Sequence, residues 1–142
     1  MRRLAIVLLL IFIIYGYCLA QSENSITIEI TNIVINGGTV YIGIFSSADS
    51  FRKEEPEFLF ELEAINAIMS QNLSLPNGEY VITAMQDANY NKKLDTGLFG
   101  IPRELIGISN YNGRGFPSRN FDRQKILVDR TTGKIIIGLY GF

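Results

Sequence analysis

The sequence contains no histidine, no tryptophan and a single cysteine, Cys18. Without histidine, a Ser-His-Asp triad, a Cys-His pair and a histidine-bound metal are all excluded. One cysteine cannot form a disulfide within the chain, so the stability of the fold has to come from packing. Paired carboxylates, such as those of a glycosidase, are the acid–base chemistry that this composition leaves open.

Charge is also scarce, because only 19% of the 142 residues are charged while 47% are hydrophobic. That balance is typical of a folded domain rather than a disordered chain. The chain has room for one domain of ordinary size. The formal net charge of −1 gives no reason to expect a nucleic-acid partner.

The first twenty residues predict a signal peptide. Arg2 and Arg3 precede an apolar run over residues 4–17, and the small residues Cys18 and Ala20 stand at the third and first positions before the expected cut. We therefore expect residues 1–20 to be removed and the remaining chain to be exported, either to the periplasm or out of the cell.

Two alternatives stay open for this segment. Its apolar run approaches the roughly 20 residues that span a bilayer, so it could be a retained membrane anchor. Lipidation of Cys18 is the other, although Tyr17 is bulky for the position before a lipidated cysteine. After cleavage, residues 21–142 carry 11 basic and 14 acidic side chains, a net charge of −3, and no thiol.

The rest of the chain predicts an all-β fold, an antiparallel Greek-key β-sandwich of about seven strands formed by residues 21–142 as a single domain. Alternating apolar and polar residues predict strands over residues 26–31, 40–44, 64–75, 79–85, 124–128 and 134–139. Turn residues at 36–38 and 75–78 predict that the first two and the next two strands form hairpins. We expect a loop with a helical turn over residues 46–63, and a strand in the middle of a sheet over residues 135–140, which are apolar on both faces.

A long stretch rich in glycine and asparagine, residues 87–122, follows the fourth strand. Its opening predicts a calcium site, because oxygen-bearing side chains stand at positions one, three, five and nine: Asp87, Asn89, Asn91 and Asp95. The match to an EF-hand is partial, since Lys92 replaces the glycine at position six and Leu98 the glutamate at position twelve. The alternative is that these side chains bond to the backbone in successive turns without a metal.

The remainder of the stretch offers two further hypotheses. In the first, aromatic and aliphatic residues fold back over one end of the sandwich: Leu98, Phe99, Ile101, Phe116 and Phe121. In the second, a surface binds an anionic or sugar ligand through Arg103, Glu104, Tyr111 and Arg114. Glu104 with Asp95 or Asp87 would also be the carboxylate pair of an enzyme.

Several of these segments together resemble the DUF2141 family of small exported bacterial proteins. The resemblance covers nearly all of the chain after the signal peptide and is carried by these segments: 38–40, 44–45, 75–80, 87–95, 100–104 and 107–110. In that family, a similar run reads Asp-x-Asn-x-Asn-Gly-x-Leu-Asp followed by Gly-x-Pro-x-Glu, with glycine where this chain has Lys92. The segment Leu75–Tyr80 is also similar to a turn of prealbumin-like sandwiches. The resemblance implies a prealbumin-like or Ig-like fold and export, and no reaction.

These observations favour a non-catalytic binding or accessory domain of the cell envelope over an enzyme. The expected partner is an envelope protein or a carbohydrate, with a membrane involved only if the signal segment is retained. A binding module should expose Tyr90, Tyr111 or Phe116, whereas a loop that is merely fastened should bury them. The runner-up is a carboxylate-dependent enzyme such as a periplasmic glycosidase.

Overall fold

The computed structural model describes residues 23–97 and 100–142, so the predicted signal peptide lies outside the described residues. The elements are β1 (Glu23–Thr31), β2 (Thr39–Phe45), α2 (Ala48–Lys53), β3 (Phe58–Glu63), β4 (Met69–Pro76), β5 (Gly78–Asp87), β6 (Leu105–Ile108), α3 (Phe121–Gln124), β7 (Ile126–Val128) and β8 (Lys134–Gly138). In the described part of the chain, no helix combines the length and the apolar character needed to cross a membrane.

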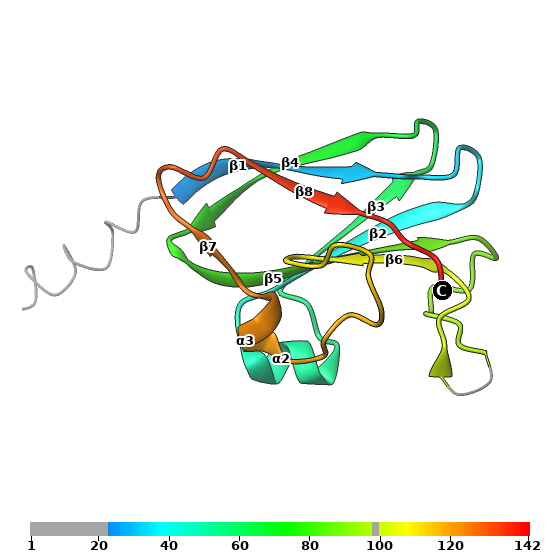
Figure 1. The fold of residues 1–142 in the computed structure, drawn as a ribbon. Coiled ribbons are helices and arrows are strands. Elements are labelled where there is room, and N and C mark those ends of the chain that lie inside the picture. The colour runs from blue at the N-terminus through cyan, green and yellow to red at the C-terminus, as the bar shows by residue number, and fades with distance from the viewer. Residues whose placement is uncertain (1–22, 98–99) are drawn as a thin grey trace, which may run out of the picture.

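The strands form two layers, which confirms the predicted β-sandwich. One sheet has the order β4-β1-β8 and the other the order β3-β2-β5-β6, with β7 paired to the start of β5. Figure 1 shows the two sheets face to face, with α2 and α3 together below the larger one. All pairs are antiparallel except β1 with β8, which is parallel.

The alternation in the sequence produces the core between the layers. Every second residue of β1 is buried, and the inward side chains Ile26, Ile28 and Ile30 are at most 1% exposed. The inward residues of β2 meet them from the other sheet: Val40, Ile42 and Ile44. Burial of aliphatic side chains at this density is the main source of stability for a domain without disulfides.

The two predicted hairpins are wrong. β1 pairs with β4 and β8, while β2 pairs with β3 and β5, so the turn at residues 36–38 carries the chain from one sheet to the other. The turn at Pro76–Gly78 does the same between β4 and β5. Turn residues allow the chain to reverse, but the choice between returning within a sheet and crossing to the opposite layer depends on distant strands.

The prediction of a central last strand is also wrong. β8 is a terminal strand of the three-stranded sheet, and Ile136 is 61% exposed on its outer face. Beyond β8 the chain leaves this sheet, because the backbone of Tyr140 forms a bridge with Ile106 of β6. This bridge joins the two layers at the end of the molecule where the chain ends (Figure 1).

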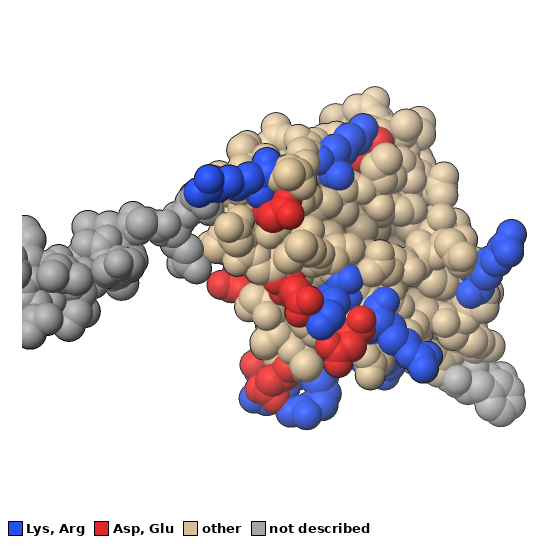
Figure 2. Space-filling view, turned by 60° about the vertical axis from the view of Figure 1, so that its left-hand side comes forward, with Lys and Arg blue, Asp and Glu red and all other residues tan. Residues whose placement is uncertain are grey.

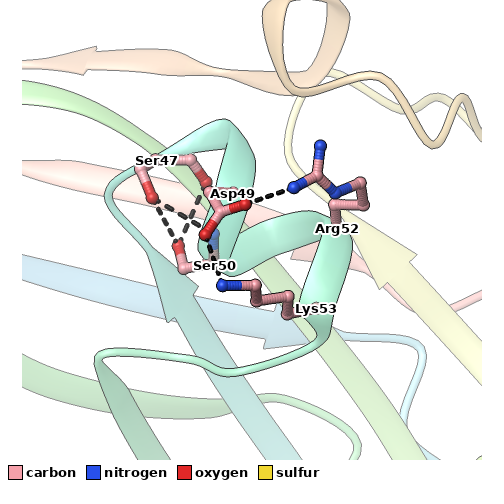
Figure 3. Close-up of polar contacts among 5 residues, drawn as sticks. All are labelled: Ser47, Asp49, Ser50, Arg52 and Lys53. Carbon is pink, nitrogen blue, oxygen red and sulfur yellow. Dashed lines mark hydrogen bonds and ion pairs between the residues drawn. The ribbon is translucent and has the colours of Figure 1, made fainter.

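The segment predicted as a loop with a helical turn contains α2, as expected, and also the strand β3. Ser47 caps the helix, since its Oγ accepts a hydrogen bond from the Ser50 N–H at 3.2 Å. Asp49 in the first turn pairs with Arg52 and Lys53 in the last (Figure 3). The short strand β6, within the predicted long loop, was likewise not expected.

Candidate functional site

The segment 87–95, called the Asp87 loop below, is organised by the carboxylate of Asp87 at the end of β5. This side chain is fully buried. Its Oδ1 accepts hydrogen bonds from the backbone N–H groups of Asn89 and Asn91 at 3.1 and 3.3 Å, and its Oδ2 from that of Lys92 at 2.7 Å. Burial alone would raise the pKa of Asp87, but hydrogen bonds from successive backbone N–H groups outweigh it and lower the pKa.

The other three predicted metal ligands lie in the same loop. The amide nitrogens of Asn89 and Asn91 both donate to Asp95 Oδ2, at 2.6 and 2.9 Å. Their amide oxygens accept backbone N–H bonds, Asn89 Oδ1 from Asn91 and Asn91 Oδ1 from Lys93. The structure thus brings all four predicted residues together, and their oxygens make the side-chain to backbone bonds of the metal-free alternative.

Two residues of the Asp87 loop have left-handed backbone conformations. Tyr90 has φ 62° and Lys92 has φ 61°. This conformation costs an L-residue roughly 1–2 kcal/mol of conformational free energy and costs glycine much less. Lys92 therefore adopts, as a lysine, a conformation that favours glycine.

Glu104 is brought against this loop by the pairing of β5 with β6. The register pairs Gln86 with Leu105, and one further step places Glu104 opposite Asp87. Between them, the Arg103 N–H donates to the Asp95 carbonyl at 2.9 Å, and the Asp95 N–H donates to Glu104 Oε2 at 3.1 Å. Glu104 is 7% exposed, and its Oε1 has no hydrogen-bond partner among the described residues.

The surroundings of Glu104 oppose its ionisation. Burial raises its pKa, and the nearby carboxylates of Asp87 and Asp95 raise it further, against one backbone hydrogen bond that lowers it. The predicted carboxylate pair therefore exists as neighbours. Both Asp87 and Glu104 are buried, however, so a sugar ring in solvent cannot reach the space between them.

A groove of about 440 Å³ lies on the outer face of the larger sheet. Its floor comes from the outward positions of three strands, among them Tyr41, Phe45, Met85 and Ile106. Leu59 of β3 and Leu94 of the Asp87 loop stand on its walls and are 57% and 39% exposed. Sequence analysis missed this groove, although apolar residues at outward as well as inward positions of β2 were a signal for it.

Two arginines line the same groove, each with an acidic partner. Arg52 pairs with Asp49 on α2, as Figure 3 shows. Arg119 lies 3.4 Å from Glu54, which is the one carboxylate among the described residues lining the groove. The rim therefore carries paired charges around an apolar floor.

A binding loop should expose its aromatic side chains and a fastened loop should bury them, and the structure shows both cases. Tyr90 and Phe116 are 66% and 65% exposed, whereas Tyr111 is half-buried. Phe116 stacks on Phe142 with ring centroids 5.2 Å apart, and Tyr111 packs edge-on against Tyr140 at 5.5 Å. Of the residues expected to cover the sandwich end, Leu98 and Phe99 lie outside the described residues and Phe116 is exposed, while Phe121 packs with Tyr111 on a small buried cluster on the larger sheet.

The four-residue ligand surface predicted in the glycine-rich stretch is not formed. Arg103 and Arg114 are exposed, but Glu104 is buried under the Asp87 loop. On the face drawn in Figure 2, acidic and basic side chains are interspersed rather than gathered by sign.

A family model described as an uncharacterized protein conserved in bacteria, DUF2141, matches residues 28–136. The chain belongs to the DUF2141 family. The match runs from within β1 to within β8 and so includes the Asp87 loop, Glu104 and the strands below the groove. The searches of curated proteins and of solved structures gave no match.

Proposed function

We propose that this DUF2141 protein is an exported, non-catalytic domain of the cell envelope that binds an apolar segment of another envelope protein in the groove of the larger sheet. The observation that carries the proposal is the floor of that groove. Soluble proteins seldom leave the outer face of a sheet apolar and hollowed unless something binds there.

A non-catalytic role is supported by where the carboxylates lie. Asp87 and Glu104 are inside the protein, and their oxygens hold backbone N–H groups. In the groove, the carboxylate of Glu54 is exposed and faces Arg119. A glycosidase mechanism uses two carboxyl groups facing the substrate, and among the described residues that line the groove Glu54 is the one carboxylate.

A protein segment suits the groove better than a carbohydrate does. Sugar hydroxyls require several convergent hydrogen-bond partners, whereas the floor is formed by Tyr41, Phe45 and Met85 with few polar groups. The interspersed charges of Figure 2 likewise support a protein partner over nucleic acid.

The remaining parts of the proposal concern location and the Asp87 loop. Export rests on the charged and apolar residues at the start of the chain, with the periplasm or the cell exterior as destination and the membrane only if that segment is retained. The Asp87 loop has an accessory role, because it carries Leu94 to the wall of the groove. Either its own hydrogen bonds or a calcium ion fastens it.

Binding of an apolar fluorescent probe, anilinonaphthalene sulfonate, tests the groove. We expect one probe per protein molecule, with amide chemical-shift changes concentrated on Met85 and Ile106. Leu59→Glu should abolish this binding because it places a charge at the wall while changing an exposed side chain.

Leu127→Glu is the matched control, since Leu127 is 63% exposed on β7 and does not line the groove. It should bind the probe like the unchanged protein. An equal loss of probe binding in both variants, or no stoichiometric binding at all, would contradict the proposal that the groove is a binding site. Chemical-shift changes at Phe116 and Phe142 with oligosaccharides, and none in the groove with the probe, would assign a carbohydrate site instead.

A further inference from the structure

Asp87, the last residue of β5, and Glu104, the residue before β6, form a buried pair of acidic side chains. Asp87 is fully buried and Glu104 is 7% exposed. Like charges opposite each other in a sheet are destabilising, and the cost rises where water is excluded. A buried pair of this kind therefore needs either a proton or a cation between its members.

The neighbourhood supplies a third acidic group, and Arg103, which lines the same small hollow as Glu104, forms no ion pair with these carboxylates in the described part of the chain. Asp95 bonds to Glu104 through its N–H and turns its carboxylate to Asn89 and Asn91. The ammonium group of Lys92 lies outward, 3.4 Å from Glu61. Among the described residues, none of the three carboxylates Asp87, Asp95 and Glu104 has an ion-pair partner.

Glu104 Oε1 is the atom that points to a ligand. It is buried, carries no hydrogen bond within the described part of the chain, and belongs to a carboxylate whose other oxygen is bonded to the Asp87 loop. An unpaired buried carboxylate oxygen is costly, and a bound cation removes that cost. The side chain also borders a hollow of about 150 Å³ together with Gln86 and Arg103.

We propose that Asp87, Asp95 and Glu104 bind a calcium ion, with Glu104 supplying the carboxylate that an EF-hand takes from its twelfth position. The amides of Asn89 and Asn91 complete the set by turning their oxygens toward the ion. Calcium suits this arrangement because it accepts six to eight oxygen ligands in variable geometry, whereas magnesium demands a regular octahedron.

The conformation described is that of the loop before such a rearrangement. Across residues 23–97 and 100–142, no group of three acidic side chains is already arranged to hold a metal ion. The two amide nitrogens that converge on Asp95 Oδ2 take the place of positive charge there.

The test is a calcium titration of the purified protein, followed by calorimetry and by thermal melts in EDTA and in millimolar calcium. We expect a dissociation constant at or below the roughly 10⁻⁴–10⁻³ M of extracellular calcium modules and a higher melting temperature with calcium. Glu104→Gln and Asp95→Asn should each weaken binding at least tenfold. Glu55→Gln, at an exposed position on the loop after α2, should leave it unchanged.

Glu104→Gln also separates the cation from a shared proton, because glutamine can donate a hydrogen bond to Asp87 as a protonated glutamate would. In EDTA this variant should be at least as stable as the unchanged protein and should have lost its response to calcium. The proposal is overturned if the unchanged protein shows no response to calcium, if Glu104→Gln keeps full affinity, or if magnesium acts equally. These readouts do not involve the groove, so either proposal can fail without the other.

Discussion

The carbonyl oxygen of Asp87 lies 1.9 Å from the position that a Cβ on Gly38 would occupy. Gly38 has φ 100°, a conformation open to glycine and strained for other residues. It is the residue before β2, at the point where β2 pairs with the end of β5, and the register aligns Thr39 with Asp87. Because Gly38 has no side chain, the backbone of Asp87 can pass close to the turn between the sheets at the point where the Asp87 loop begins.

Replacing Gly38 with alanine should therefore destabilise the protein by about 2–4 kcal/mol, from backbone strain together with overpacking against Asp87. Chemical denaturation measures this change. Gly133→Ala is the control, because a Cβ there meets nothing within 4 Å, and its effect should be close to zero. Similar losses for both variants would contradict the close approach.

The pH dependence of stability in calcium-free buffer should show two opposite contributions. Asp87 has a lowered pKa, so its contribution is present above its ordinary value of 3.8 and is lost as the pH falls below it. Glu104 has a raised pKa, so stability falls as the pH rises from its ordinary value of 4.5 toward the raised one. These two groups together predict a maximum in mildly acidic solution.

Thermal melts from pH 3 to pH 8 would check this profile. Glu104→Gln should remove the decline on the alkaline side and leave the acid side unchanged, because the acid side belongs to Asp87. Asp87→Asn should flatten the acid side and also reduce the alkaline decline, because the Asp87 carboxylate helps to raise the pKa of Glu104. A profile that Glu104→Gln leaves unaltered would show that Glu104 does not titrate abnormally.

Lys92 offers a test of the turn in the Asp87 loop. Its φ of 61° favours glycine, and its Nζ lies 3.4 Å from Glu61 at the surface. Lys92→Gly and Lys92→Ala both remove this exposed ion pair, which contributes little. The glycine variant should be the more stable of the two by about 1 kcal/mol in urea denaturation, since alanine retains the strain. The reverse order would contradict a left-handed turn there.

The elements that sequence could predict are those governed by local patterns. β1 alternates because its inward residues enter the core and its outward ones do not; β2 keeps the inward alternation of Val40, Ile42 and Ile44, and both strands appear as expected. The alternation pattern did not predict β3, because apolar residues stand on both faces of this strand. Phe58 and Leu59 are 37% and 57% exposed. Pairing could not be inferred, because it depends on contacts between residues far apart in the chain.

The candidate site, too, was predictable only where it depends on residues close together in the sequence. Asp87, Asn89, Asn91 and Asp95 lie within nine residues, so their spacing alone brought them together. For Glu104, the sequence predicts a pairing with Asp95 or Asp87 in a catalytic role only. Its position opposite Asp87 depends on the register of β5 with β6, a strand that the pattern did not predict. The groove depends on four strands at once and had no local signal strong enough to locate it.

Adjacent residues of β8 test how a terminal strand contributes to the core. Ile137 is 1% exposed and packs between the sheets, while Ile136 is 61% exposed on the outer face. Ile137→Ala should cost about 2–4 kcal/mol in unfolding free energy, because it leaves a cavity under β1. Ile136→Ala should change stability by less than about 0.5 kcal/mol. Because the two substitutions remove the same atoms from neighbouring positions, denaturation curves that coincide would contradict the burial of one face of β8, and the reverse order would mean that β8 packs with the other face inward.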